Sequence, residues 1–206
     1  MGIQKARALA PALALLAPLL GLALFLRAGS ADSPAAEFQA ALPAEGAVNA
    51  GAGADNDAQR LRAHLERQPR DARGWVILAR LHADMDRFDE AAKAYAKALA
   101  LSSKVAADPA VWCEYADALG MAQGGSLDGR PREFIDRALA LNPNHPKALE
   151  MAGSSEYAQG NYAMALRFWR PLLTVQKPGS QAYAELAAAI ARTERLAEMA
   201  VATKRH

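Results

Sequence analysis

The chain has 206 residues, a formal net charge of +2 and one cysteine, Cys113. A single cysteine excludes an intramolecular disulfide and any CxxC metal or redox motif. Lys5, Arg7 and Arg27 flank an apolar run, and without them 21 basic residues face 22 acidic ones. The remaining charge is therefore balanced, which argues against a nucleic-acid-binding face. Abundant Ala and Leu with few β-branched runs favour an all-α fold.

The N-terminal part predicts a membrane segment. Residues 1–7 are basic, and residues 8–26 form an uncharged stretch of 19 residues. As a helix this stretch would extend about 28 Å, close to the hydrocarbon thickness of a bilayer. An uncleaved anchor is favoured over a signal peptide, whose apolar region usually has about 7–15 residues, although the small residues 28–31 leave cleavage open as an alternative. Lys5 and Arg7 precede the span, so the positive-inside bias places the following domain outside the cytoplasm.

Residues 27–54 are rich in Ala, Gly, Pro and Ser and show scarcely any periodicity, which is typical of a flexible linker. Residues 55–199 are predicted to form the folded domain, and 200–206 a polar tail. The domain opens with a helix over 57–68 that carries Leu61 and Leu65 on one face. We expect this helix to cover the open end of a helical stack.

Residues 72–105 predict a helical hairpin with the tetratricopeptide-repeat (TPR) pattern. That pattern is an aromatic residue, Leu and a small residue on the first helix, followed by Ala, an aromatic residue and Ala on the second. It is matched by Trp75, Leu78, Ala79, Ala91, Tyr95 and Ala98. One such hairpin cannot bury its own apolar face, so the pattern predicts neighbouring repeats.

Two further hairpins follow, over residues 109–145 and 146–178. Trp75, Trp112 and Leu149 occupy equivalent positions at a spacing of 37 residues, against about 34 for the standard unit. Each step is therefore longer than the standard unit. Residue spacing places the additional residues of the first step between repeats one and two, and those of the second step in the Gly-rich loop of repeat two.

A last helix over 180–198 would cover the C-terminal end of the stack. The sequence thus predicts an all-α TPR superhelix of about three helical hairpins, with capping helices at both ends and one N-terminal membrane span.

Nothing in the sequence predicts an enzyme, a metal site or a cofactor. The four histidines, His64, His82, His145 and His206, lack a ligand-like neighbour at helical spacing. The loop that begins Gly124-Gly125 is not preceded by a strand or followed by GK[ST], so it is not a phosphate-binding loop.

Binding to another protein remains the favoured role. In stacked TPR hairpins the first helices line a concave face, and the side of each helix opposite its Trp/Leu/small-residue stripe points into it. We expect cations on this face to orient acidic groups of a peptide, and apolar residues to contact it; an ordinary solvated helix face is the alternative. The predicted peptide-binding groove consists of Arg73, Val76, Arg80, Asp84, Cys113, Asp117, Met121, Lys147, Glu150, Ser154 and Tyr157.

Two segments are more specific than the TPR pattern. Residues 118–131 read ALGMAQGGSLDGRP, and residues 141–149 read LNPNHPKAL. Together with the span and the linker, they make the chain resemble the periplasmic TPR domain of the c-type cytochrome maturation family CcmI/CycH. Full-length members of the family usually carry another span and a cytoplasmic segment upstream, and residues 8–26 correspond to the span next to the TPR domain.

The resemblance implies a chaperone in the bacterial inner membrane with its TPR domain in the periplasm. It would bind apocytochrome c, largely through the C-terminal helix of the cytochrome, and present it for haem ligation. Subunits of the haem lyase complex are the other implied partners. Two alternatives stay open: a general TPR scaffold in another cell-envelope complex, and a partner domain for a catalytic subunit on another chain.

Overall fold

The computed structural model describes residues 50–203. The predicted basic N-terminus, the span over 8–26 and most of the linker over 27–54 lie outside this range, as does the end of the tail. No helix within residues 50–203 is long and apolar enough to cross a bilayer. The described residues belong to one compact unit.

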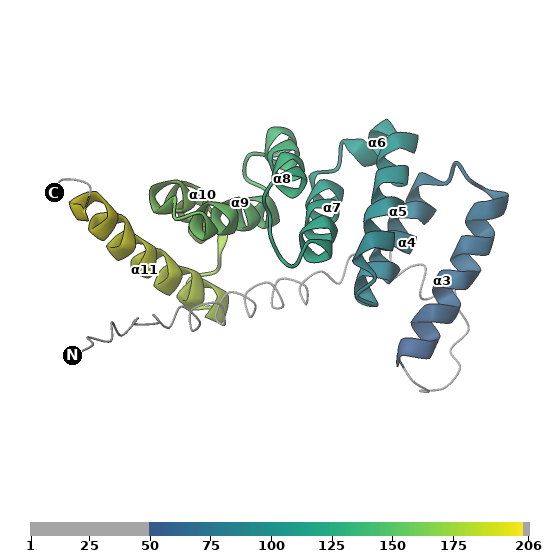
Figure 1. Cartoon of the computed structure of the whole chain (residues 1–206), viewed down its shortest axis with the longest axis horizontal. Coiled ribbons are helices and arrows are strands. Elements are labelled where there is room, and N and C mark those ends of the chain that lie inside the picture. The colour runs from purple at the N-terminus through teal and green to yellow at the C-terminus, as the bar shows by residue number, and fades with distance from the viewer. Residues whose placement is uncertain (1–49, 204–206) are drawn as a thin grey trace, which may run out of the picture. The chain divides into compact units, whose positions relative to one another are not determined.

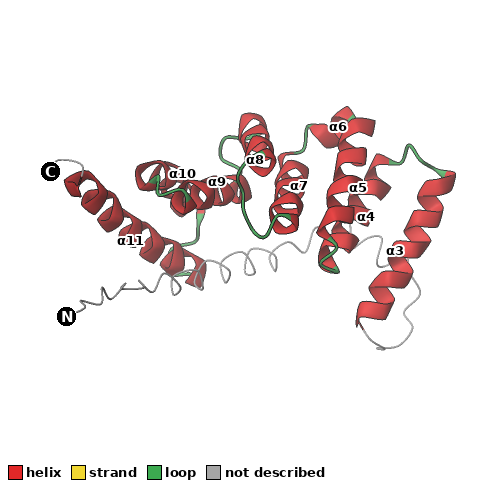
Figure 2. Ribbon diagram, viewed as in Figure 1, coloured by secondary structure: helices red, strands yellow, loops and turns green. Residues whose placement is uncertain are grey.

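Residues 50–203 fold into helices and connecting loops without a β-strand (Figure 2). The predicted all-α fold is therefore confirmed for this part of the chain. The helices are α3 (Ala50–Arg67), α4 (Ala72–Asp84), α5 (Phe88–Leu101), α6 (Ser103–Ala106), α7 (Pro109–Ala122), α8 (Arg130–Leu141), α9 (Pro146–Ala158), α10 (Tyr162–Val175) and α11 (Gln181–Thr203).

Three antiparallel hairpins, α4–α5, α7–α8 and α9–α10, follow one another along the unit (Figure 1). Each packs on the next through the second helix of one hairpin and the first helix of the following one. The turns of the first and third hairpins each contain a residue in the left-handed conformation at the same repeat position. These residues are Asp86 (φ 57°) and Gly160 (φ 76°). Aspartate is one of the few non-glycine residues that tolerate this conformation.

The additional residues in the two 37-residue steps between repeats have separate structural causes. The short helix α6 lies between the first two hairpins. The loop between α7 and α8 holds Gly124, Gly125 and Gly129 at positive φ. Gln123 stabilises this loop, because its side-chain amide donates hydrogen bonds to the carbonyl oxygens of Ser126 and Asp128, at 2.6 and 3.0 Å.

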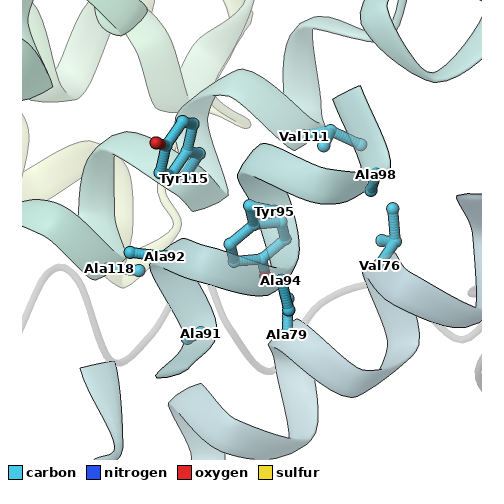
Figure 3. Packing of buried hydrophobic residues seen from close by; sticks show 10 residues of the cluster. All are labelled: Val76, Ala79, Ala91, Ala92, Ala94, Tyr95, Ala98, Val111, Tyr115 and Ala118. Atoms are coloured by element: carbon cyan, nitrogen blue, oxygen red, sulfur yellow. The ribbon is translucent and has the colours of Figure 1, made fainter. Parts of the chain in front are cut away.

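Alanines at the helix contacts let the first hairpin close around one aromatic residue. Tyr95 on α5 is only 2% exposed and packs in one cluster with residues of α4 and α7 (Figure 3). Its ring centroid is 6.2 Å from that of Tyr115, which stacks on Phe134 at 4.4 Å. The labelled residues packed around Tyr95 and Tyr115 are Val76, Ala79, Ala91, Ala92, Ala94, Ala98, Val111 and Ala118.

Trp75 is less buried than its place in the TPR pattern predicts. Its ring packs partly against α3 and partly against the first hairpin, and the indole N–H donates to the carbonyl oxygen of Pro69 at 3.1 Å. The ring therefore lies at the junction of α3 and α4 and not in the centre of the core.

Both end helices are longer than predicted. Helix α3 begins at Ala50 instead of residue 57, and Asp55 in its extra turn forms an ion pair with Arg87 at 2.6 Å. Helix α11 continues to Thr203 instead of residue 198, because no Gly or Pro interrupts the residues after Glu198. The ends of α3 and α11 were therefore placed too far inward by the sequence pattern.

Candidate peptide-binding face

The candidate site is the side of α4, α7 and α9 that carries the predicted groove residues, which we call the first-helix face. The structure places these residues in three burial classes. Arg73, Asp84, Asp117 and Met121 are exposed; Arg80, Lys147, Ser154 and Tyr157 are half-buried; Val76, Cys113 and Glu150 are buried.

The buried members differ from the open groove positions that helical spacing predicts. Val76 belongs to the core cluster around Tyr95, and Cys113 to the cluster between the second and third hairpins. The helices packed against α4 and α7 cover these two positions, so the side chains of Val76 and Cys113 stabilise the stack. The surface of the first-helix face that a ligand can reach is therefore formed by its exposed and half-buried residues.

Arg80 is held by a carboxylate of the next repeat. Its Nε and Nη2 atoms donate to the two carboxylate oxygens of Glu114 at 3.0 and 2.9 Å. Burial is the largest single influence and lowers the pKa of the Arg80 guanidinium, but the hydrogen bonds and negative charge of Glu114, together with Tyr95 and Asp108, raise the pKa overall. Such a bidentate pair links α4 to α7 with a fixed geometry. Arg80 is thus engaged within the protein and is not an open cation as the sequence suggests.

Glu150 lies on α9 and is only 6% exposed. Its Oε2 atom has no hydrogen-bond partner in the described part of the chain, and the nearest cation, Lys147 Nζ, lies 3.9 Å away. Burial raises the pKa of the Glu150 carboxyl; Lys147 lowers it, and Asp117 on α7 raises it. The structure therefore brings together three of the predicted groove residues from two repeats.

Cys113 lies beside His145, with 3.6 Å between its Sγ and the imidazole Nδ1. The same Nδ1 accepts the backbone N–H of Ala148 at 3.3 Å and caps α9. Burial raises the pKa of the Cys113 thiol to about 12 and lowers the pKa of His145. A protonated, buried thiol is a poor nucleophile. Among residues 50–203, no three His, Cys, Asp or Glu side chains are grouped so that they could hold a metal ion.

Two residues supply apolar surface to the face. Met121 is 44% exposed near the end of α7. Tyr157 is partly covered, with ring contacts to Tyr162 at 5.5 Å and to Trp169 at 5.7 Å. Met121 is therefore the better candidate for direct contact with a ligand, because Tyr157 also takes part in the core of the third hairpin.

Glu114 is the residue of this site that sequence reasoning missed. It lies next to Cys113 and was not assigned to the groove. At the 37-residue spacing of this chain the equivalent of Arg80 is Asp117, and Glu114 lies three residues, about one helical turn, before Asp117. The sequence signal was therefore an acidic residue one helical turn from the position that repeats Arg80.

The arrangement of these hairpins defines the class of protein. The chain superposes on the crystal structure of MamA protein with a TM-score of 0.58 and 16% identity, over 75% of this chain and 80% of that one. It also superposes on the first TPR of Spaghetti (RPAP3) bound to an HSP90 peptide, with a TM-score of 0.50 and 17% identity, over 60% of this chain and 93% of that one. The fold is that of a TPR protein.

The family follows from sequence comparison. A family model described as the Cytochrome c-type biogenesis protein H TPR domain matches residues 58–183, and the chain belongs to this family. It is 31% identical to CycH of Pseudomonas aeruginosa over 168 residues, which are 79% of this chain and 37% of that protein. It is 32% identical to CycH of Rhizobium meliloti over 157 residues, or 75% and 39% of the two chains. The chain thus spans about two fifths of the length of these relatives.

The chain is also similar to the formate-dependent nitrite reductase complex subunit NrfG of Escherichia coli O157:H7. It is 26% identical over 120 residues, which are 58% of this chain and 59% of NrfG.

Proposed function

We propose that the first-helix face binds apocytochrome c and presents it for haem ligation during c-type cytochrome biogenesis. The observation that carries this proposal is membership in the CycH TPR family, whose relatives are named cytochrome c-type biogenesis proteins. The chain acts as a chaperone and performs no chemistry itself. Residues 8–26 anchor it in the bacterial inner membrane, with the TPR domain in the periplasm and the haem lyase complex as its partner.

The composition of the first-helix face supports a peptide ligand. Met121 offers a flexible apolar contact, and charged residues on α4, α7 and α9 surround the buried positions. An amphipathic helix can place its apolar side on such a surface and its polar side toward water. Methionine adapts to differently shaped side chains, which suits a chaperone that serves several cytochromes.

Selection of unfolded cytochrome needs no contact with haem. A folded cytochrome buries the apolar side of its C-terminal helix against its own core, whereas the apo form exposes it. A face that binds this helix therefore captures the chain before haem attachment and releases it on folding. The energy of release comes from the folding of the cytochrome.

A direct test uses the full chain in mild detergent and a labelled peptide of the C-terminal helix of a c-type cytochrome. Fluorescence anisotropy should report saturable binding that unlabelled apocytochrome c displaces. Absence of binding by both peptide and apocytochrome would reject the proposal. A general envelope scaffold would instead retain assembly proteins, without apocytochrome or haem lyase subunits, from a membrane extract.

Met121→Ala should weaken binding of this peptide by about 1–3 kcal/mol, because it removes an apolar contact at the ligand surface. Met164→Ala is the matched control: Met164 is 37% exposed, but it lies on α10, outside the first-helix face. Both variants should keep the helical circular dichroism of the parent. Equal loss of affinity in the two variants would show that Met121 is not a specific contact.

A further inference from the structure

The junction of α7 and α9 holds two carboxylates and one cation. Asp117 is exposed on α7 and forms no ion pair within the described residues, and Glu150 is buried on α9. Lys147 is the cation beside Glu150. Cys113 and His145 add no charge at neutral pH, because burial raises the pKa of the thiol and lowers that of the imidazole. Among Asp117, Glu150 and Lys147, the ionised side chains therefore carry one negative charge in excess.

Glu150 is incompletely satisfied within the protein. Its Oε2 atom is buried and accepts no hydrogen bond from the described residues. The separation of 3.9 Å from Lys147 Nζ is an ion-pair distance but too long for a hydrogen bond. A buried carboxylate without donors is costly, and a ligand that supplies donors would recover that cost.

Arg80 cannot serve as this donor because both carboxylate oxygens of Glu114 hold it. Lys147 keeps 29% of its side-chain surface exposed. A long, partly exposed lysine can turn outward when another cation approaches, since its four-carbon stem is flexible. Glu150 would then become accessible from the first-helix face beside Asp117.

We propose that Glu150 and Asp117 form a subsite for a Lys or Arg side chain of the bound polypeptide. The proposal rests on the proposed function and adds the chemistry of one ligand residue to it. The cation displaces Lys147, donates hydrogen bonds to Glu150 and neutralises the excess charge of the junction. The ligand helix is therefore basic where it crosses from the second hairpin to the third.

The test measures binding of apocytochrome c to the full chain in mild detergent by titration calorimetry. Glu150→Gln should weaken binding about tenfold, since it removes a buried charge partner of the ligand. Asp117→Asn should weaken it about two- to fivefold, as expected for an exposed pair. Glu133→Gln is the matched control, because Glu133 is an exposed carboxylate on α8, and it should bind like the parent.

The ligand side of the pair is found by exchanging each Lys and Arg of the cytochrome C-terminal helix for Gln. One of these exchanges in the cytochrome should weaken its binding to the parent chain, but should weaken its binding to the Glu150→Gln variant little further. This non-additivity identifies a direct pair. Additive losses for every exchange would overturn the subsite.

The pH dependence gives an independent readout. Burial raises the pKa of Glu150, and the charged groups that act on it are Lys147 on its own helix and Asp117 on α7; Trp169, which packs from α10, is uncharged. Protonation removes the charge that receives the cation, so affinity should fall as pH drops through the raised pKa of Glu150. Glu150→Gln should lack this part of the pH dependence.

The outcomes separate this inference from the proposed function. If the parent, Glu150→Gln and Asp117→Asn bind apocytochrome c equally tightly, the subsite is rejected and the proposed function stands. If the parent does not bind apocytochrome c at all, both are rejected. Unchanged thermal unfolding of the variants confirms that any loss is local.

Discussion

Gly153→Ala is expected to destabilise the protein by about 1–3 kcal/mol or more, because the third hairpin has no room for one additional methyl group. Gly153 is buried on α9 where α10 crosses it. A Cβ atom there would lie 2.7 Å from Cε2 of Trp169 and closer still to Nε1 and Cδ1. The indole cannot retreat freely, since it is 2% exposed and donates to the carbonyl oxygen of Glu150 at 3.3 Å.

Gly53→Ala is the matched control for this prediction. Gly53 is also helical, but apart from its chain neighbours and the backbone of its own helix, no atom of the described residues lies within 4 Å of the position its Cβ would take. Alanine there should stabilise the helix by about 0.5–1 kcal/mol. Urea denaturation followed by circular dichroism compares the two variants in one buffer. Equal stability of Gly153→Ala and the parent would contradict the packing of Trp169 against α9.

Removal of residues 180–206 should cost about 3–6 kcal/mol and cause aggregation. Helix α11 contributes Leu186 and Ile190 to the last core cluster, and burial of each such side chain is worth about 1.5–3 kcal/mol. The same truncation uncovers Leu172 and Trp169 on α10, which are nearly inaccessible in the intact chain. A domain of this size has a total stability of about 5–15 kcal/mol, so the loss is a large fraction.

Thermal unfolding and size-exclusion chromatography test this truncation. Removal of residues 204–206 alone is the control, because it leaves α11 intact, and it should leave the melting temperature unchanged. If the shorter chain without α11 melts at the same temperature as the parent and stays monodisperse, α11 does not cover the end of the stack.

The hairpins could be predicted from sequence because a TPR unit repeats its small and aromatic residues at fixed intervals. Ala79 and Ala98 mark the close contacts of the first hairpin, and Gly153 marks the equivalent contact of the third. The insertions were also detectable, since α6 and the loop before α8 lengthen an otherwise constant spacing. The ends of helices were harder to predict, because no Gly or Pro near the end of α11 marks where that helix stops.

The candidate face was predicted less well than the fold. Helical spacing shows which side of α4, α7 and α9 a residue occupies, but not how closely neighbouring helices approach. Val76 and Cys113 are buried because the helices packed beside them complete their core clusters. The pairing of Arg80 with Glu114 depends on the stagger between repeats, which a single repeat does not contain.

The central claim is that this CycH-family TPR domain selects cytochrome before haem attachment. Calorimetric titration of the full chain with the apo and holo forms of one c-type cytochrome tests it most directly. We expect tight binding of apocytochrome, at least about tenfold weaker binding of holocytochrome, and competition by a peptide of the C-terminal helix. Equal affinity for the apo and holo forms would contradict the account.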